Sequence, residues 1–271
     1  MDTSGIVLCG GRSTRMGRPK ALLPWGGATL VEAVVRSLLE AVDRVVVVHS
    51  GAFELPRLPV PVVLDREPGL GPLAGIREGL HALPGGLAFV ASTDAPFLSP
   101  GFVGSMLGFG GAAALEQDGF VQTLCAVYDA GRASAADALL ESGARRPLAL
   151  LEASGYRRVA PAEVEDADSI RGFNRPEEYL AAVRDRQPGA RSTLEFLGRA
   201  RRAMGRECMD VPVGRLGEVL GHAEPALRVC ADGAVAKPFL VSLNGRDFVR
   251  DPALPVGPGD RVFVMDSAVG G

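Results

Sequence analysis

An apolar run near the start of the chain stops abruptly at two glycines. Residues Gly5–Leu8 include β-branched Ile6 and Val7, which is the pattern of a buried strand. Gly10 and Gly11 then remove two Cβ atoms where the strand ends, so backbone N–H groups could approach an anionic ligand closely. The start of the chain therefore predicts a strand followed by a ligand-binding turn, as in open α/β sheets.

The loop after the glycines concentrates positive charge. The segment Leu8–Pro24 reads LCGGRSTRMGRPKALLP and places four cations within nine residues, namely Arg12, Arg15, Arg18 and Lys20. This charge density favours a triphosphate as the partner of the loop. The alternative is a solvated basic turn, because neither the G-x-G-x-x-G dinucleotide motif nor the G-x-x-x-x-G-K-[ST] P-loop is present.

Strand and helix patterns alternate after this loop. A T-x-x-E capping pattern precedes an apolar-periodic helix over Leu30–Val42, and β-branched runs follow at Arg44–His49 and Val60–Leu64. This order predicts a Rossmann-like α/β fold with a mostly parallel, doubly wound sheet. Asp65 follows the third strand, where such sheets place residues that contact ligands.

A second acidic residue follows a central strand pattern. Leu87–Ala91 leads into STDAP, which places Asp94 at the carboxyl end of that strand. A carboxylate there could coordinate Mg²⁺ on a bound triphosphate. The alternative is a structural role, in which Asp94 caps the local turn or the helix after Ser99. Before this strand, the glycine-rich stretch Gly69–Ile76 predicts a helix with Pro72 at its first position.

Two further patterns complete this part of the chain. Segments Ala112–Glu116 and Val121–Tyr128 flank a turn of hairpin type. Asn174 is predicted to be the N-cap of the next helix with Glu177 at position N3, and a ligand contact by Asn174 is the alternative.

A polar stretch divides the sequence. Residues 187–192, QPGARS, predict a linker between one domain over residues 1–186 and a second over residues 193–271. The second part has its own strand and helix patterns, which suggest a small α+β sheet domain. It ends on Gly270 and Gly271, and a di-glycine tail can enter a narrow active site and present its carboxylate for activation.

Composition limits the kind of function. Hydrophobic residues make up 47% of the chain and charged residues 23%, which is typical of a globular enzyme, and the net charge of −3 argues against broad nucleic-acid binding. Neither a signal-peptide pattern nor a membrane span is recognisable, so we expect a cytoplasmic protein. The cysteines form no C-x-x-C pair, which predicts buried free thiols: Cys9, Cys125, Cys208 and Cys230.

Five motifs in order resemble the MobA-type nucleotidyltransferases, which attach GMP to molybdopterin: LCGGRSTRMGRPKALLP, GPLAGI, STDAPF, QTLCAVY and FNRPEEY. The resemblance covers residues 4–186 and implies a Rossmann-like nucleotidyltransferase fold, GTP and Mg²⁺ as co-substrates, and release of pyrophosphate. It also implies site residues. The nucleotide would be held by the backbone of Leu8, Cys9, Gly10 and Gly11, its phosphates by Lys20, the nucleoside by Asp65 and the metal by Asp94. Arg15 and Lys20 would stabilise the charge on the leaving pyrophosphate.

The end of the chain, LNGRDFVRDPALPVGPGDRVFVMDSAVGG, resembles the final segment of MoaD and ThiS, the β-grasp (ubiquitin-like) sulfur carriers. The resemblance implies that Gly271 becomes an acyl-adenylate and then a thiocarboxylate. It further implies an E1-like adenylating enzyme and the large subunit of molybdopterin synthase as partners. Both halves would then serve molybdenum cofactor synthesis.

Other functions remain open from the sequence. A cytidylyltransferase of the same fold could act on molybdopterin, although GPLAGI favours the guanylyl branch by resemblance. A sugar-phosphate nucleotidyltransferase is a further alternative. In a different class, the chain would be a non-catalytic sulfur carrier whose front domain only docks partners.

Overall fold

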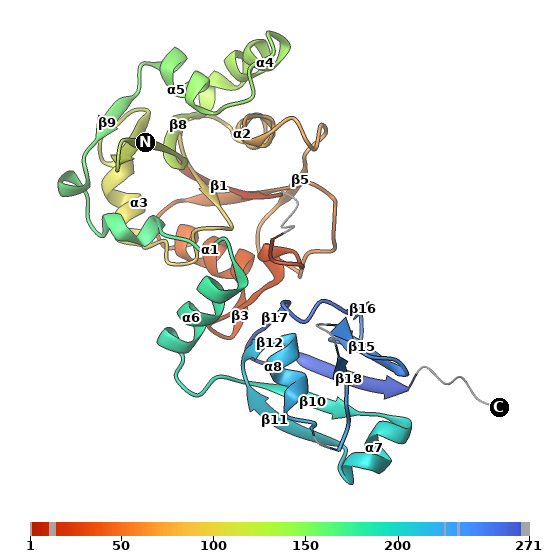
Figure 1. Ribbon diagram of the computed structural model, residues 1–271. Helices are drawn as coiled ribbons and strands as arrows, with labels where there is room; N and C mark the ends of the chain where they lie inside the picture. The colour runs from red at the N-terminus through yellow and green to blue at the C-terminus, as the bar shows by residue number, and fades with distance from the viewer. Residues whose placement is uncertain (1, 11–14, 225, 232–233, 267–271) are drawn as a thin grey trace. The chain divides into compact units, whose positions relative to one another are not determined.

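The computed structural model describes residues 2–10, 15–224, 226–231 and 234–266 (Figure 1). The chain divides into two compact units. We call residues 1–12 and 30–172 the first unit, and residues 13–29 and 173–271 the second unit. The basic loop therefore leaves the first unit and continues in the second.

The first unit is built on a seven-stranded sheet with the strand order β5-β4-β1-β6-β8-β7-β9. Among its described strands, β8 runs antiparallel to both neighbours and every other pairing is parallel. The predicted mostly parallel sheet is thus confirmed. The strands are β1 (Thr3–Cys9), β4 (Arg44–His49), β5 (Val62–Leu64), β6 (Leu87–Ser92), β7 (Ala113–Gln117), β8 (Phe120–Asp129) and β9 (Arg157–Val159).

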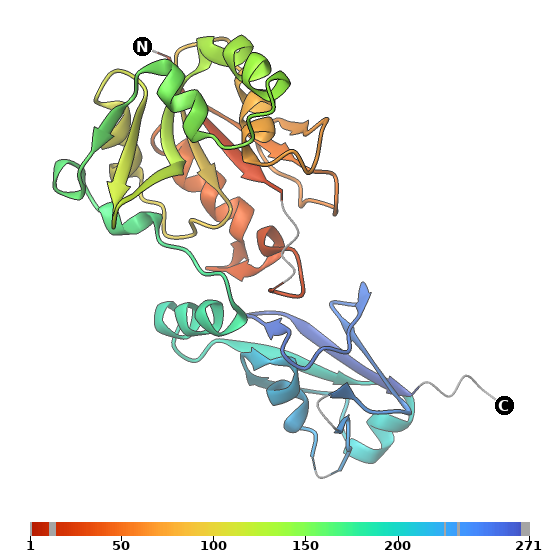
Figure 2. The ribbon, with the colours of Figure 1, turned by 45° about the horizontal axis from the view of Figure 1, so that its top comes forward.

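Helices cover both faces of this sheet (Figures 1 and 2). Helices α2 (Pro72–His81), α4 (Ala133–Glu141) and α5 (Leu148–Ser154) bury a core with the strands on one face. Helices α1 (Leu30–Leu39) and α3 (Pro100–Leu107) lie on the other face. Pro72 occupies the first turn of α2, as predicted, because its fixed φ suits that position and its missing N–H costs no helix hydrogen bond there.

The second unit contains a five-stranded sheet with the order β11-β10-β18-β15-β16. Strands β10 and β18 are parallel neighbours, whereas the other pairings are antiparallel. The strands are β10 (Arg191–Phe196), β11 (Cys208–Pro212), β15 (Phe239–Leu243), β16 (Asp247–Phe248) and β18 (Arg261–Asp266). Helices α7 (Gly198–Met204) and α8 (Leu216–Gly221) share its apolar core, and two short ribbons pair β12 (Gly214–Arg215) with β17 (Pro255–Val256) and β13 (Cys230–Ala231) with β14 (Ala234–Val235).

The segment 13–29 and helix α6 (Pro176–Arg186) also belong to the second unit. The segment forms a short 3-10 helix, Lys20–Leu22, and the hairpin β2 (Pro24–Trp25) with β3 (Ala28–Thr29). The rings of Trp25 and Phe173 lie 5.7 Å apart, and the Tyr179 hydroxyl donates to the Pro24 carbonyl at 2.8 Å. These contacts join the segment 13–29 and α6 within the second unit. The predicted linker over residues 187–192 stays a prediction.

The predicted N-cap of α6 is wrong by one residue. Arg175 is the N-cap and Pro176 takes the first helical position, so Glu178 rather than Glu177 stands at N3. The Glu178 carboxylate accepts from the backbone N–H of Asn174 at 2.7 Å and of Arg175 at 3.2 Å. The Asn174 side chain is therefore not the cap.

Among the described residues, none of the helices combines the length and the apolar composition that crossing a membrane requires.

Candidate functional site

The carboxyl ends of neighbouring parallel strands bring together the predicted site residues of the first unit. Cys9 at the end of β1 pairs with His49 of β4, and Leu8 pairs with Ser92 of β6. The exposed Gly10 therefore follows the strand that lies between β4 and β6. Parallel sheets bind ligands at this edge, because turns and backbone N–H groups gather there. Gly11 lies outside the described residues.

Asp94 lies in the turn that follows β6, directly beside the end of β1. The Thr93 N–H donates to the Leu8 carbonyl at 3.4 Å, and the Asp94 N–H donates to the Ser92 hydroxyl at 3.2 Å. The Ser99 hydroxyl, rather than Asp94, caps α3 by accepting from the Phe102 N–H at 3.2 Å. The alternative that Asp94 caps this helix is therefore wrong.

A glycine that the sequence analysis did not single out fits against this turn. A Cβ at Gly172 would lie 1.9 Å from the Asp94 carbonyl oxygen, so no side chain can be accommodated there without moving the backbone. Its signal in the sequence was a glycine immediately before FNRPEEY. Gly172 thus allows two main-chain segments of the first unit to meet closely at Asp94.

Asp65 follows the edge strand β5, beyond β4 from the end of β1. Its backbone N–H donates to the His49 carbonyl at 2.8 Å, which continues the pairing of β4 with β5. Its carboxylate accepts from the Glu67 N–H at 3.0 Å and so stabilises the local turn. The half-buried side chain stands at the carboxyl edge of the sheet, and its contact with a ligand stays a prediction.

Two thiols lie at this edge. Burial raises the pKa of Cys9 to about 12. Burial, assisted by the negative charge of Asp94, raises the pKa of Cys125 to about 12 as well. Both thiols are therefore protonated near neutral pH, and neither is suited to act as a nucleophile.

The predicted cations Arg15 and Lys20 fall in the second unit. Arg15 is exposed in the turn that enters the segment 13–29. Lys20 opens the 3-10 helix, and its Nζ donates to the Asn174 side-chain oxygen at 3.0 Å. Asn174, which the sequence analysis favoured as a helix cap, instead orients a predicted phosphate-binding lysine.

Arg18 makes a contact that corrects the sequence interpretation of the loop. Its Nη1 lies 2.6 Å from Asp260 Oδ2, and both side chains are largely buried. One of the four cations grouped as partners for a triphosphate is thus paired with a carboxylate of the same chain. Asp260 was missed by sequence reasoning, since nothing local in GPGDRV links it to a residue 242 positions earlier.

The donor set constrains any metal ion. In the described part of the chain, no group of three or more His, Cys, Asp and Glu side chains gathers to hold a metal. Mg²⁺ in nucleotide enzymes is commonly bound by one or two carboxylates together with substrate phosphates and water. The Asp94 carboxylate at the carboxyl edge of the sheet is compatible with that arrangement, and its metal role stays a prediction.

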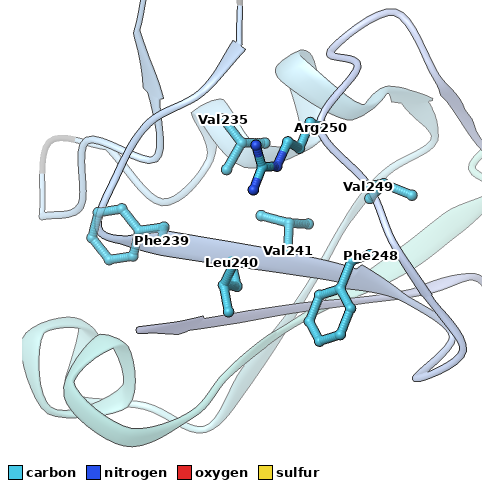
Figure 3. A pocket seen from close by; sticks show the side chains of 7 residues that line it. All are labelled: Val235, Phe239, Leu240, Val241, Phe248, Val249 and Arg250. Carbon is cyan, nitrogen blue, oxygen red and sulfur yellow. The ribbon is translucent and has the colours of Figure 1, made fainter. Parts of the chain in front are cut away.

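A separate pocket of about 230 Å³ lies in the second unit (Figure 3). Its lining is apolar except for Arg250, and no residue predicted to bind the nucleotide belongs to it. The lining residues are Val235, Phe239, Leu240, Val241, Phe248, Val249 and Arg250. A single cation among apolar side chains does not match the charge of a triphosphate.

Comparisons with known proteins concern the family and the fold of the chain. The model of the family described as MobA-like NTP transferase domain matches residues 5–159. The probable molybdenum cofactor guanylyltransferase of Mycobacterium bovis is 37% identical over 185 residues, covering 64% of this chain and 92% of the relative.

Two solved structures share the fold. The molybdopterin-guanine dinucleotide biosynthesis protein A of Archaeoglobus fulgidus superposes with a TM-score of 0.54 at 22% identity, covering 66% of this chain and 96% of that one. The 2-C-methyl-D-erythritol 4-phosphate cytidylyltransferase of Thermus thermophilus superposes with a TM-score of 0.50 at 21% identity. The superposition covers 65% of this chain and 95% of that one. With the sequence match over more than half of its length, this chain belongs to the family of MobA-like NTP transferases and is a nucleotidyltransferase.

Proposed function

We propose that this nucleotidyltransferase transfers GMP from GTP to molybdopterin, with or without bound molybdenum, and releases pyrophosphate. The product is the guanine dinucleotide form of the molybdenum cofactor. The observation that carries this proposal is the 37% identity to a probable molybdenum cofactor guanylyltransferase across 92% of that relative. The predicted site residues at the carboxyl edge of the sheet are compatible with it.

The reaction is an in-line displacement at phosphorus. A phosphate oxygen of molybdopterin forms a bond to the α-phosphorus of GTP, and the bond from that phosphorus to the bridging oxygen of pyrophosphate breaks. The nucleophile is already anionic, so no strong general base is required. The backbone after β1, with Arg15 and Lys20, binds the phosphates and stabilises the negative charge that grows on pyrophosphate.

Mg²⁺ is the metal that we assign to Asp94. When bound, it would neutralise phosphate charge and hold the triphosphate in one conformation. The resemblance to the MobA-type enzymes assigns Asp65 to the nucleoside, and its position after β5, at the same edge as Gly10 and Asp94, is compatible with that role.

The test is pyrophosphate release by the purified protein with molybdopterin, Mg²⁺ and each of GTP, CTP and ATP in turn. Pyrophosphate release with GTP supports the proposal. A preference for CTP would indicate a molybdopterin cytidylyltransferase instead. The fold does not decide the base, since a Thermus thermophilus cytidylyltransferase shares it. Turnover with a sugar phosphate in place of molybdopterin would favour a sugar-phosphate nucleotidyltransferase. The absence of turnover with any nucleotide would favour a non-catalytic sulfur carrier.

We further propose that the C-terminal region is a β-grasp sulfur carrier of the MoaD and ThiS kind. Its sheet supports this, because the first strand β10 and the last strand β18 are parallel neighbours at the centre. Gly271, which would be adenylated and converted to a thiocarboxylate, lies outside the described residues. The expected partners are an E1-like adenylating enzyme and the large subunit of molybdopterin synthase.

Two variants separate these activities. Asp94→Ala is expected to abolish nucleotide transfer while leaving thiocarboxylation at Gly271 intact. Deletion of Gly271 is expected to prevent thiocarboxylation and to leave guanylyl transfer unchanged. Loss of both activities in Asp94→Ala would contradict the assignment of two separate modules.

A further inference from the structure

A buried ion pair ties the segment 13–29 to the C-terminal sheet region of the second unit. Arg18 Nη1 lies 2.6 Å from Asp260 Oδ2, and Nη2 lies 3.4 Å from Oδ1. Only 11% of the Arg18 side chain and 2% of the Asp260 side chain are exposed. Two parallel bonds between a guanidinium and a carboxylate fix orientation as well as distance.

The carboxylate is held in place from its own side. The Asn244 amide donates to Asp260 Oδ1 at 2.8 Å, and the Gly257 N–H donates to Oδ2 at 2.8 Å. Asn244 also accepts from the Arg261 N–H at 2.8 Å, which links it to the start of β18. A buried charge is tolerated only when it is paired and hydrogen-bonded. The buried Asp260 carboxylate therefore needs a cation beside it in addition to these two hydrogen-bond donors.

The residues immediately before Arg18 also contact other parts of the second unit. Met16 is 1% exposed. Gly17 has a φ of 67°, and a Cβ there would lie 2.8 Å from the Leu254 side chain. The positive φ at Gly17 favours glycine, and the segment lies against Leu254, the residue before β17.

The ion pair also constrains Lys20. Pro19 is the residue between Arg18 and Lys20. Its ring fixes φ at −58° by preventing rotation about the N–Cα bond of the proline. Lys20 then opens the 3-10 helix, and Asn174 accepts from its ammonium group at 3.0 Å. Fixing Arg18 therefore fixes the backbone from which the Lys20 side chain extends.

We infer that Asp260 is a positioning residue for the transferase reaction, which acts through Arg18 to hold Lys20 in place for the phosphates of the nucleotide. This inference rests on the proposed function of Lys20. Arg18 serves as the anchor of the loop, because a phosphate could reach its guanidinium only by displacing a buried carboxylate. The C-terminal region is then a structural part of the transferase in addition to any role as a sulfur carrier.

The experiment compares the full-length protein with Asp260→Asn and with Asp247→Asn, which removes the same charge from an exposed position on β16. Trp25, the single tryptophan of the chain, is 2% exposed and reports on the segment 13–29 without any substrate. We expect Asp260→Asn to increase acrylamide quenching of Trp25 and to shift its emission to longer wavelength. We also expect its kcat/KM for GTP to fall by about 10- to 100-fold, chiefly through KM, since a misplaced binding group costs that much.

Variants on the loop side guard against a general folding defect. Arg18→Gln should reproduce both the increased quenching of Trp25 and the lower kcat/KM for GTP, and Arg18→Lys should retain part of the activity. The double variant Arg18→Gln with Asp260→Asn should have a kcat/KM no lower than that of the less active single variant. Additive losses in the double variant, or unchanged quenching and KM in both single variants, would overturn the inference. If the wild-type protein fails to use GTP, the proposed function fails, and the Trp25 measurement still decides whether the ion pair anchors the loop.

Discussion

The carboxyl edge of the seven-stranded sheet and the segment 13–29 both carry predicted nucleotide-binding residues, but they are built in different ways. At the sheet edge, Gly10 and Asp94 are placed by backbone pairing between β1 and β6, in which Leu8 stands opposite Ser92. In the segment, Lys20 is oriented by a side chain from a residue 154 positions away. The first arrangement depends on main-chain register and the second on side-chain contacts between distant parts of the sequence.

This difference has consequences for substitutions. Main-chain register survives most changes of side chain, so replacing a polar side chain at the sheet edge, such as that of Asp94, should affect chemistry with little effect on the fold. A substitution that disturbs the main chain there, such as one at Gly172, should affect both. Side-chain contacts with distant residues hold the segment, so substitutions of its charged residues should change its position as well as its charge. The following predictions test this contrast, beginning with the largest effect.

Asp94→Asn should lower kcat for pyrophosphate release by about 100- to 1,000-fold, because an amide replaces the anionic group assigned to the metal. The midpoint of thermal unfolding should change little. The matched control is Asp118→Asn, which removes a charge from an exposed turn of the same unit where φ is 52°, a conformation that asparagine also adopts. Equal activity of the two variants would contradict the role given to Asp94.

Lys20→Met should reduce kcat/KM for GTP by about 10- to 100-fold, the loss expected for one charge-assisted phosphate contact. Asn174→Ala should have a smaller effect in the same direction, because it leaves the ammonium group and removes only the acceptor that orients it. Steady-state kinetics at varied GTP concentration measures both. A larger defect in Asn174→Ala than in Lys20→Met would show that the asparagine has a role of its own.

Gly172→Ala should destabilise the protein by about 1–3 kcal/mol, because the added methyl group would overlap the Asp94 carbonyl and force the backbone to move. Transfer should decrease with it, since the same turn carries Asp94. Gly104→Ala in α3 is the control: a Cβ there meets no atom within 4 Å, and we expect stabilisation of about 0.5–1 kcal/mol. Urea denaturation of the two variants gives the comparison.

Alkylation of the cysteines should leave the sheet edge untouched at neutral pH. A thiol reacts as its thiolate, and a pKa raised from 9.0 to about 12 means that Cys9 and Cys125 remain protonated until the pH approaches 12. Cys208 is exposed and should be modified first at pH 8 by iodoacetamide. Mass spectrometry of tryptic peptides identifies the modified sites, and rapid labelling of Cys9 in the folded protein would contradict its burial.

Local sequence patterns predicted most elements of the fold. The β-branched run at Arg44–His49 forms a strand with those bounds. The helix predicted over Leu30–Val42 ends earlier, at Leu39, because apolar periodicity does not mark where a helix stops. Propensity and periodicity are properties of neighbouring residues, so they are readable from the sequence.

The sequence by itself determined where the turns at the sheet edge fall and which charges they carry, because a strand that ends at glycine or aspartate is a local feature. Only the tertiary structure decided what those charges contact. It paired Arg18 with Asp260, hydrogen-bonded the Lys20 ammonium group to the Asn174 side chain, and packed Gly172 against the Asp94 carbonyl. Each of these contacts joins residues far apart in the chain, and no local pattern encodes which of several similar side chains will meet once the chain has folded.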